Sequence, residues 1–355
     1  MALATTRFLR QVGAVALGFA IGSSLVFGDV AHAADGTPAK QLFGKVQLPS
    51  NSAASPIGFY AKGCMAGAVA IPTDGPTWQA MRLSRNRRWG NPAMISLLER
   101  FSQDAVSLGW GSGILIGDIS QPRGGPMLTG HASHQIGLDA DIWFQPKPAK
   151  ALSAAAREDM PFVSMLDKSK FLTVNPKRWT KTHANLVMQA ASYPQVERVF
   201  VNPAIKKKLC ETWTGDRGLL GKVRPVYGHD EHFHIRMHCP SGAANCKAQA
   251  AVTPGDGCDK SLAWWFTKEP WAKPAVNPNA KPVKPRFTML SDLPKACTAV
   301  LAAPAASEKS ATFGTAYAAQ PANDADAAIQ DVINTTAGDL PESEIPIPQA
   351  RPALQ

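Results

Sequence analysis

The sequence lacks the motifs by which many hydrolases and metal proteins are recognised. It contains no GxSxG, no HExxH and no SxxK in the setting of a serine acyl-enzyme, which argues against serine hydrolases and helix-borne zinc peptidases. No two of its six cysteines form a CxxC, which argues against a structural zinc finger or a thioredoxin-like redox site. After the N-terminal region, no stretch is apolar enough to span a bilayer. Any catalytic chemistry must therefore rest on other residues.

The N-terminal region has the residue order of a secretory signal peptide. Two arginines precede an apolar run over residues 12–27, and Ala31-His32-Ala33 follows. This order of charge, apolar run and small residues predicts a signal peptide over residues 1–33, cleaved after Ala33. An uncleaved membrane anchor is the alternative, but the run is shorter than the roughly 20 residues of a spanning helix. We therefore expect the mature protein outside the cytoplasm, without stable membrane insertion; no feature fixes its oligomeric state.

Composition divides the mature chain in two. Residues 34–302 contain all six cysteines, and an even number in an oxidising compartment indicates disulfide bonds, whose pairing the spacing leaves open. Residues 303–355 are rich in alanine and proline and carry seven acidic residues against two basic ones, which predicts a disordered acidic tail. The whole chain has a net charge of +10, so residues 34–302 are more basic still and suit a polyanionic partner such as the cell wall. No nucleic-acid partner is expected, because the protein is exported and has no recognisable nucleic-acid module.

The apolar pattern of residues 34–302 alternates between helical and strand periods. Asn91-Pro92, followed by apolar residues about 3.6 positions apart, predicts a helix that ends near Leu108. The mixed order of elements predicts a single α+β domain with a mainly antiparallel sheet, flanked by helices and disulfide-linked loops. Further elements are expected as a strand over 113–119, a helix over 185–192, a strand over 196–201, a helix over 203–213 and an extended proline-rich segment over 270–285.

Two segments alternate with a period of two, which is typical of strands with one buried face. In the first, the apolar residues Leu138, Ala140, Ile142 and Phe144 fall on the face opposite Asp139 and Asp141. In the second, Phe233, Ile235 and Met237 fall opposite His232, His234, Arg236 and His238. Each strand is thus predicted to have one face for the core and one polar face for a site.

Six of the eight histidines lie in or beside these two segments. Catalytic zinc typically takes three protein ligands from nitrogen or carboxylate oxygen and leaves a fourth position to water. His134, Asp141 and His234 match that set if the two strands meet. The six clustered histidines are His131, His134, His229, His232, His234 and His238.

The other histidines are predicted to act around this zinc site. His232 shares a strand face with His234, and we expect it to be the base that takes a proton from the water. His229 is expected to hydrogen-bond a ligand or the oxyanion of the reaction. His131 is expected to be an extra ligand or a hydrogen-bond partner of one.

Asp139 shares the face of Asp141 and is predicted to orient a histidine. Taken alone, each of these polar residues would be explained as a satisfied side chain, and it is their joint pattern that favours a site. His238 is expected to be structural. Four arginines are candidates for binding a substrate carboxylate, with a solvated role as the simpler alternative: Arg85, Arg87, Arg123 and Arg236. Trp264 and Trp265 are candidates for stacking on sugar, with a place in the core as the simpler alternative.

The spacing of His134, Asp141 and the later His232-x-His234 resembles metallopeptidases of the lysostaphin and D-alanyl-D-alanine peptidase group. Longer strings narrow the resemblance to the penicillin-insensitive murein endopeptidases, and the similarity covers roughly residues 47–297. These strings are SRNR at 84–87, GDISQPRGG at 117–125, GHASHQIGLDADIW at 130–143 and GHDEHFHIR at 228–236.

The resemblance implies an α+β zinc peptidase that cleaves the D-alanyl-meso-diaminopimelyl cross-link of peptidoglycan in the periplasm and is insensitive to penicillin. It implies a zinc ion (Zn2+) at His134, Asp141 and His234, with His131 also associated with metal. It also implies a base at His232 that His229 assists. The implied disulfides are Cys64 with Cys297, Cys210 with Cys258, and Cys239 with Cys246.

Two rival functions remain open at this point. One is a wall-associated zinc-binding module that has lost catalysis, and the other is a carboxypeptidase that removes a terminal D-alanine. Retention of function after loss of His232 would favour the first, and the mass of the product would identify the second.

Overall fold

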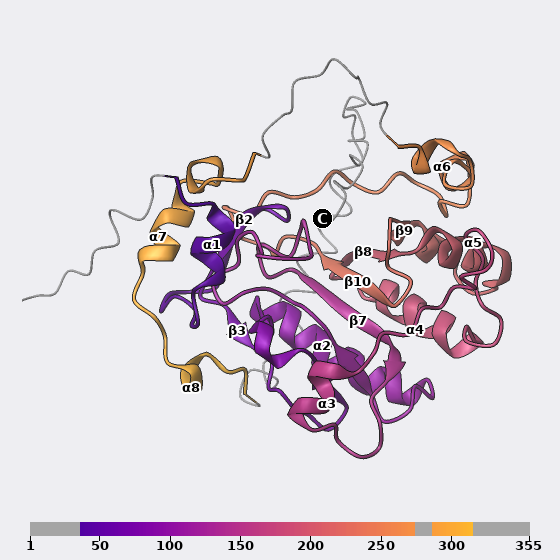
Figure 1. Cartoon of the computed structure of the whole chain (residues 1–355), viewed down its shortest axis with the longest axis horizontal. Helices are drawn as coiled ribbons and strands as arrows, with labels where there is room; N and C mark the ends of the chain where they lie inside the picture. Colours follow the sequence, from indigo (N-terminus) through magenta and orange to yellow (C-terminus); the bar gives the residue numbers. More distant parts are fainter. Residues whose placement is uncertain (1–35, 274–285, 315–355) are drawn as a thin grey trace, which may run out of the picture. The chain divides into compact units, whose positions relative to one another are not determined.

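The computed structural model describes residues 36–273 and 286–314 (Figure 1). The predicted signal peptide, residues 315–355 of the predicted tail and most of the proline-rich segment lie outside the described residues. In the described part of the chain, no helix combines the length and the apolar character needed to cross a membrane.

A six-stranded sheet organises the domain. Its strand order is β4-β6-β7-β10-β8-β9. The three central pairings, β6 with β7, β7 with β10 and β10 with β8, are antiparallel, which confirms the mainly antiparallel sheet. The bounds of the strands are β4 Trp78–Ala80, β6 Ile114–Ile116, β7 Asp139–Pro146, β10 His232–Met237, β8 Val196–Val201 and β9 Val223–Pro225.

The two outer pairings are parallel, which the sequence pattern did not indicate. β4 pairs with β6 and β8 with β9 in the parallel sense. Parallel neighbours need a long crossover connection, usually a helix. Here α2 (Pro92–Ser107) connects β4 to β6, and α5 (Pro203–Thr212) connects β8 to β9. The sheet is therefore mixed at its edges.

The predicted helices are present. The side chain of Asn91 caps α2 and accepts from Ala93 N, and Asn202 caps α5 in the same way. Each is followed by proline at the first helical position, where its missing N–H costs nothing. The third predicted helix, over 185–192, is α4 (Lys181–Ser192). The strand expected over 113–119 is shorter, because only Ile114–Ile116 pair as β6.

The core lies on the apolar face predicted for β7 and β10. Ile142, Phe233 and Ile235 are fully buried there, and Phe101 of α2 packs its ring edge-on to Phe233 with centroids 6.2 Å apart. The opposite face of β7 is buried as well, since Asp139 and Asp141 are 0% and 4% exposed. Buried carboxylates need charged or hydrogen-bonding partners. The partners of Asp139 and Asp141 form the candidate active site.

The remaining elements surround the sheet. β1 and β2 form an antiparallel hairpin, and β3 pairs with β5. In Figure 1, α7 lies beside β2 and α5 beside β9, as their contacts also show. The bounds are α1 Ala39–Gly44, β1 Ser55–Phe59, β2 Lys62–Ala66, β3 Val69–Ala70, β5 Trp89–Gly90, α3 Ala154–Asp159, α6 Lys260–Trp264, α7 Ala296–Ala302 and α8 Glu308–Ala311, with short 3-10 turns at Leu83–Arg85, Gly218–Lys222, Glu269–Trp271 and Leu290–Asp292.

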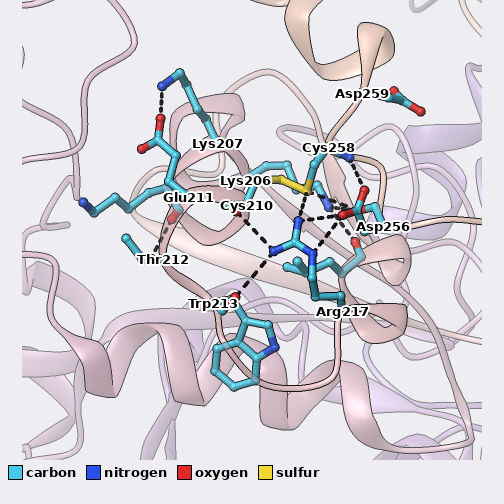
Figure 2. The surroundings of a disulfide bond; sticks show 12 residues. Lys206, Lys207, Cys210, Glu211, Thr212, Trp213, Arg217, Asp256, Cys258 and Asp259 are labelled. Carbon is cyan, nitrogen blue, oxygen red and sulfur yellow. Dashed lines mark hydrogen bonds and ion pairs between the residues drawn. A yellow bond between two sulfur atoms is a disulfide. The ribbon is translucent and has the colours of Figure 1, made fainter.

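All six cysteines are paired as the resemblance implied. Cys64 of β2 joins Cys297 of α7, and Cys239 joins Cys246 directly after β10. Figure 2 shows the third disulfide, between Cys210 of α5 and Cys258, beside the ion pair of Arg217 and Asp256. The three disulfides thus join the β1–β2 hairpin to α7, join α5 to the segment before α6, and close a short loop after β10.

Contacts with the rest of the domain continue past residue 302, where the acidic tail was expected to begin. Phe313 is 2% exposed in the core, and its backbone N–H donates to Ala70 O at 2.8 Å. Glu308 of α8 forms an ion pair with Arg88. The overall composition of residues 303–355 gives no indication that Phe313 is buried. Burial of its aromatic ring helps to hold the segment around it in place.

Candidate active site

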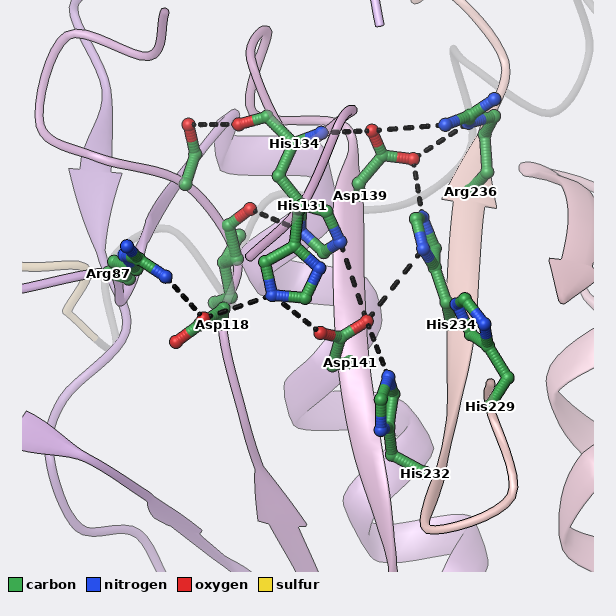
Figure 3. A network of polar contacts seen from close by, with 12 residues as sticks. Arg87, Asp118, His131, His134, Asp139, Asp141, His229, His232, His234 and Arg236 are labelled. Carbon is green, nitrogen blue, oxygen red and sulfur yellow. Dashed lines mark hydrogen bonds and ion pairs between the residues drawn. The ribbon is translucent and has the colours of Figure 1, made fainter. Parts of the chain in front are cut away.

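The first part of the site is the loop before β7. His131 and His134 lie on this loop, and Asp141 lies on β7 beneath it (Figure 3). His134 Nε2 is 3.4 Å from Asp141 Oδ1, and His131 Nε2 is 3.3 Å from Asp141 Oδ2. One potential ligand atom from each of the three lies within 4.8 Å of the other two. A metal ion can lie at ordinary coordination distances from three ligand atoms spaced in this way.

The second part comes from β10 through the strand register. His234 pairs with Asp141 across the antiparallel ladder, so both side chains lie on the same face of the sheet. His234 Nδ1 is 3.8 Å from Asp141 Oδ1, and His232 Nε2 is 3.8 Å from the same oxygen. The structure thus brings together the two distant segments whose meeting the sequence analysis required.

Among the described residues, His131 rather than His234 joins His134 and Asp141 in a group whose ligand atoms all lie within 4.8 Å of one another. His131 Nε2 already contacts Asp118 Oδ2 at 3.0 Å, whereas the Nδ1 atom of His234 faces Asp141. Ligand atoms of a tetrahedral zinc lie about 3.3 Å apart, and the distances from Asp141 to His131 (3.3 Å) and to His134 (3.4 Å) are close to this value, whereas that to His234 is 3.8 Å. The contact of His131 Nε2 with Asp118 is the feature that distinguishes the two histidines.

Hydrogen bonds determine which imidazole nitrogens are free to ligate. His134 Nδ1 donates to Ile119 O at 2.8 Å, so its Nε2 atom faces Asp141. His234 Nε2 donates to Asp139 Oδ1 at 2.7 Å, so its Nδ1 atom faces Asp141. Among the described residues, His134 Nε2 and Asp141 Oδ1 are buried without a hydrogen-bond partner. A buried polar atom without a partner is costly, and a shared cation would satisfy both.

The electrostatics of the protein alone also favour a cation between these atoms. Burial opposes a charge on His134, but Asp141 outweighs it and raises the pKa of His134 to about 9. Burial lowers the pKa of His234 to about 4 in spite of Asp139, which leaves its Nδ1 lone pair available at neutral pH. A proton on His134 is the simplest occupant of this position, and a metal ion replaces such a proton when it binds.

Asp139 holds both histidines in these orientations. Its side chain is fully buried and accepts from His234 Nε2, from His134 N at 3.0 Å and from Arg236 Nε at 2.7 Å. Burial opposes the charge of Asp139, but the nearby Arg236 and His234 hold the pKa of this carboxyl well below its usual range. Arg236 also stacks on the Tyr60 ring at 4.2 Å, so it is a buried partner of Asp139 and not a free substrate-binding arginine.

Replacing Asp139 by asparagine should weaken metal binding without removing a ligand. The amide carries no charge to compensate Arg236, and its NH2 group would face the donors that now bind Asp139. Changes to groups that hold a metal-bound histidine typically cost about 10- to 100-fold in metal affinity, and the unpaired buried arginine should lower the free energy of unfolding by about 3 kcal/mol. Competition with a chelating dye and urea unfolding measure these effects.

Asp159→Asn, on the exposed end of α3, is the matched control for Asp139→Asn and should change neither quantity. Unchanged zinc affinity in Asp139→Asn would contradict the orienting role.

Asp118 belongs to the site although its position in the sequence has no metal-ligand spacing. Its Oδ2 atom contacts Arg87 Nη1 at 2.9 Å, His131 Nε2 at 3.0 Å and Arg85 Nη1 at 3.2 Å. Burial opposes its charge, but the contacts with His131 and Arg87 lower the pKa of Asp118 to about 2. Asp118 follows β6 and is not spaced from any histidine as a metal ligand would be. Its only sequence signal is that it belongs to the GDISQPRGG string.

The arginines considered for a substrate carboxylate have different surroundings. Arg87 is buried against Asp118, and Arg123 donates to the carbonyls of Leu48, Val300 and Leu301. Arg85 keeps 41% of its side chain exposed. Of these three, Arg85 is therefore the one with a side chain open to solvent.

The loop before β10 holds His229 in a strained conformation. Its φ is 54°, in the left-handed region that non-glycine residues rarely adopt. Nδ1 of His229 donates to Tyr227 O at 2.8 Å, and Asn202 binds this loop through His229 O and Gly228 O. Burial lowers the pKa of His229 to about 3, so the imidazole is neutral. Its ring centroid lies 5.0 Å from that of His232.

The comparisons with known proteins agree with one another. A family model described as penicillin-insensitive murein endopeptidase matches residues 56–302. A protein of Haemophilus influenzae with that name is 45% identical over 245 residues, which cover 68% of this chain and 84% of the relative. Proteins of the same name from Klebsiella pneumoniae (37% identity over 269 residues, 76% and 94% covered) and Salmonella heidelberg (39% over 259 residues, 72% and 89% covered) are also similar.

Proposed function

The chain belongs to the penicillin-insensitive murein endopeptidase family, and we propose that it is a periplasmic zinc peptidase that cleaves D-alanyl-meso-diaminopimelyl cross-links in peptidoglycan. One observation carries the zinc proposal: His134 Nε2 and Asp141 Oδ1 are buried and unpartnered within 3.4 Å of each other. Family membership supports the peptidase activity, and the names of the relatives support murein as the substrate.

The proposed zinc ligands are His134, Asp141 and His234. Two imidazoles and a carboxylate are a donor set of catalytic zinc, which leaves one position for water. Zinc in such a site supplies a Lewis acid for the scissile carbonyl and lowers the pKa of water. His131 remains a candidate for an additional ligand, although its contacts with Asp118 and Asp141 favour a role in holding Asp141.

His232 is the proposed general base. It lies at the start of β10 with 22% of its side chain exposed, and its Nε2 atom is directed to the same Asp141 oxygen as the ligands. From there it takes the proton of the attacking water and returns it to the leaving amine. His229 is neutral and next to His232, and we assign to it a hydrogen bond that stabilises the oxyanion of the reaction.

The proposed location follows from the N-terminal segment and the cysteines. A signal peptide over residues 1–33 exports the chain, and three disulfides suit the oxidising compartment outside the cytoplasm. Peptidoglycan is the proposed partner in that compartment. No nucleic-acid partner and no stable membrane insertion are proposed for the mature protein.

Zinc-loaded mature protein should convert cross-linked muropeptide dimers to monomers. A chelator should abolish the conversion, added zinc should restore it, and penicillin should leave it unchanged, because no serine nucleophile takes part. Mass spectrometry of the products measures each result. Loss of a single alanine from monomers would identify a carboxypeptidase instead, and intact dimers with a fully zinc-loaded protein would refute the proposal.

A further inference from the structure

A large aromatic side chain is exposed on the surface of the described chain. Phe171 is 61% exposed, the largest exposed fraction among the large hydrophobic residues of the described chain that are exposed. Trp271 is 37% exposed, and its ring meets that of Phe171 edge-on with centroids 5.7 Å apart. Exposed apolar groups that gather in one patch are characteristic of binding surfaces.

The backbone is built to present Phe171 outward. A tight hairpin over residues 165–175 is closed by a bridge between Leu166 and Val174 and by a bond from Asp167 N to Thr173 O at 2.8 Å. At its tip, Leu172 has φ 39°, in the left-handed region. Strain of this kind persists where the surrounding structure enforces it, often at binding sites. Packing of Phe171 into the core cannot be the reason, since the ring is exposed.

This hairpin is attached directly to the loop that carries His229 and His232. Met165 N donates to Asp230 O at 2.7 Å, and Lys168 Nζ donates to Asp230 Oδ2 at 2.7 Å. Ser164 Oγ also donates to Asp230. The base of the hairpin that carries Phe171 is therefore hydrogen-bonded to the residue that follows His229.

A row of aromatic rings makes a second connection between Phe171 and the catalytic loop. The ring of Trp271 lies 5.1 Å from that of Tyr227, which lies 4.8 Å from that of Trp265. The carbonyl of Tyr227 accepts the hydrogen bond of His229. We call Phe171, Tyr227, Trp265 and Trp271 the aromatic ledge.

A hollow of about 700 Å³ adjoins the ledge between the hairpin and α5. This volume lies within the usual range for small-ligand sites. Three lysines and two carboxylates line it, and they include two ion pairs, Lys207 with Glu211 (Figure 2) and Lys170 with Asp167. The small net charge suits an uncharged, hydroxyl-rich ligand with few carboxylates better than a polyanion. The charged lining residues are Asp167, Lys170, Lys207, Lys208 and Glu211.

We propose that the aromatic ledge and this hollow bind the glycan strand of peptidoglycan. The C–H faces of N-acetylated sugar rings stack on Phe171 and Trp271, and Lys208 of the hollow binds a carboxylate of the attached stem peptide. The inference rests on the proposed function, because it describes a further part of the same substrate. A glycan subsite would account for two features of the hairpin. Its exposed tip carries an aromatic residue, and its base is hydrogen-bonded to the loop of His229.

Two substrates test the inference with the zinc-loaded mature protein. One is a muropeptide dimer with its disaccharides, and the other is the same cross-linked peptide without sugars. In Phe171→Ala, kcat/KM should fall about five- to tenfold on the sugar-bearing dimer, the loss of one aromatic stacking contact, and should stay unchanged on the sugar-free peptide. Phe171→Trp should keep the wild-type value on both.

Phe287→Ala is the matched control, because Phe287 is 48% exposed and lies outside the ledge and the hollow. It should change neither rate. An equal loss on both substrates in Phe171→Ala, or no loss on either, would overturn the glycan subsite.

Direct binding separates this inference from the proposed function. Peptide-free glycan chains should quench the tryptophan fluorescence of the wild-type protein and should bind about fivefold or more weakly to Phe171→Ala. Glycan binding by a protein that cleaves neither dimer would refute the proposed function and support the subsite. Cleavage of both substrates without any glycan binding would support the proposed function and refute the glycan subsite.

Discussion

Replacing Asp141 by asparagine should remove both the metal and the activity. Its Oδ1 atom faces ring nitrogens of His134, His232 and His234 at 3.4 to 3.8 Å. An amide at this position ligates zinc poorly, since zinc prefers a charged carboxylate to a neutral oxygen. We expect zinc content to fall from near one ion per chain to a small fraction, and kcat/KM on muropeptide dimers to fall by about a thousandfold or more.

Inductively coupled plasma mass spectrometry after gel filtration measures the zinc, and chromatography of the products measures the rate. The asparagine side chain has the size of the aspartate, so circular dichroism should show a folded protein. Asp159→Asn on α3 is again the control and should keep metal and rate. An Asp141→Asn protein with full zinc content and near wild-type turnover would exclude the proposed site.

Replacing His232 by alanine should separate metal binding from catalysis. His232 lies beside the proposed ligands and belongs to none of the hydrogen bonds that orient His134 or His234. Zinc content should therefore stay near that of the wild type. Loss of a general base typically lowers the rate by about 10²- to 10⁴-fold, so kcat should fall by that factor with a small change in KM.

The control for His232→Ala is His238→Ala, because His238 is exposed beyond the other end of β10. It should keep both zinc and rate. If His232→Ala lost zinc together with activity, His232 would be a ligand and another residue would be the base. If the rate were unchanged, the chain would not use His232 for proton transfer.

The two central strands show how much of the fold local pattern can predict. Alternation of apolar and polar residues in 138–144 and 232–237 assigns each side chain to a face, because successive residues of a strand point to opposite sides. The helices after Asn91 and Asn202 were predictable for a similar reason, since a capping side chain and a following proline are local signals. The parallel outer strands were not, because β4 and β9 are three residues each and their partners lie across a helix.

The site was predictable only where its residues share a spacing. Asp139 and Asp141, like His232 and His234, are two residues apart on one strand face, and a pair of such faces indicates a shared site. Asp118 differs in this respect. A single carboxylate after a short strand has no local signal, and Arg236 becomes a partner of Asp139 only through the pairing of β7 with β10.

By itself, then, the sequence determined which face of each strand is polar, which residues have metal-binding chemistry, and, through long matching strings, to which family the chain is similar. Only the tertiary structure decided that His234 lies opposite Asp141, that Asp118 holds His131, and that Phe313 is part of the core. The physical reason is range. Periodicity and capping act over a few residues of chain, whereas the pairing of Asp141 with His234 joins strands about 90 residues apart, and its energy depends on burial that no local pattern specifies.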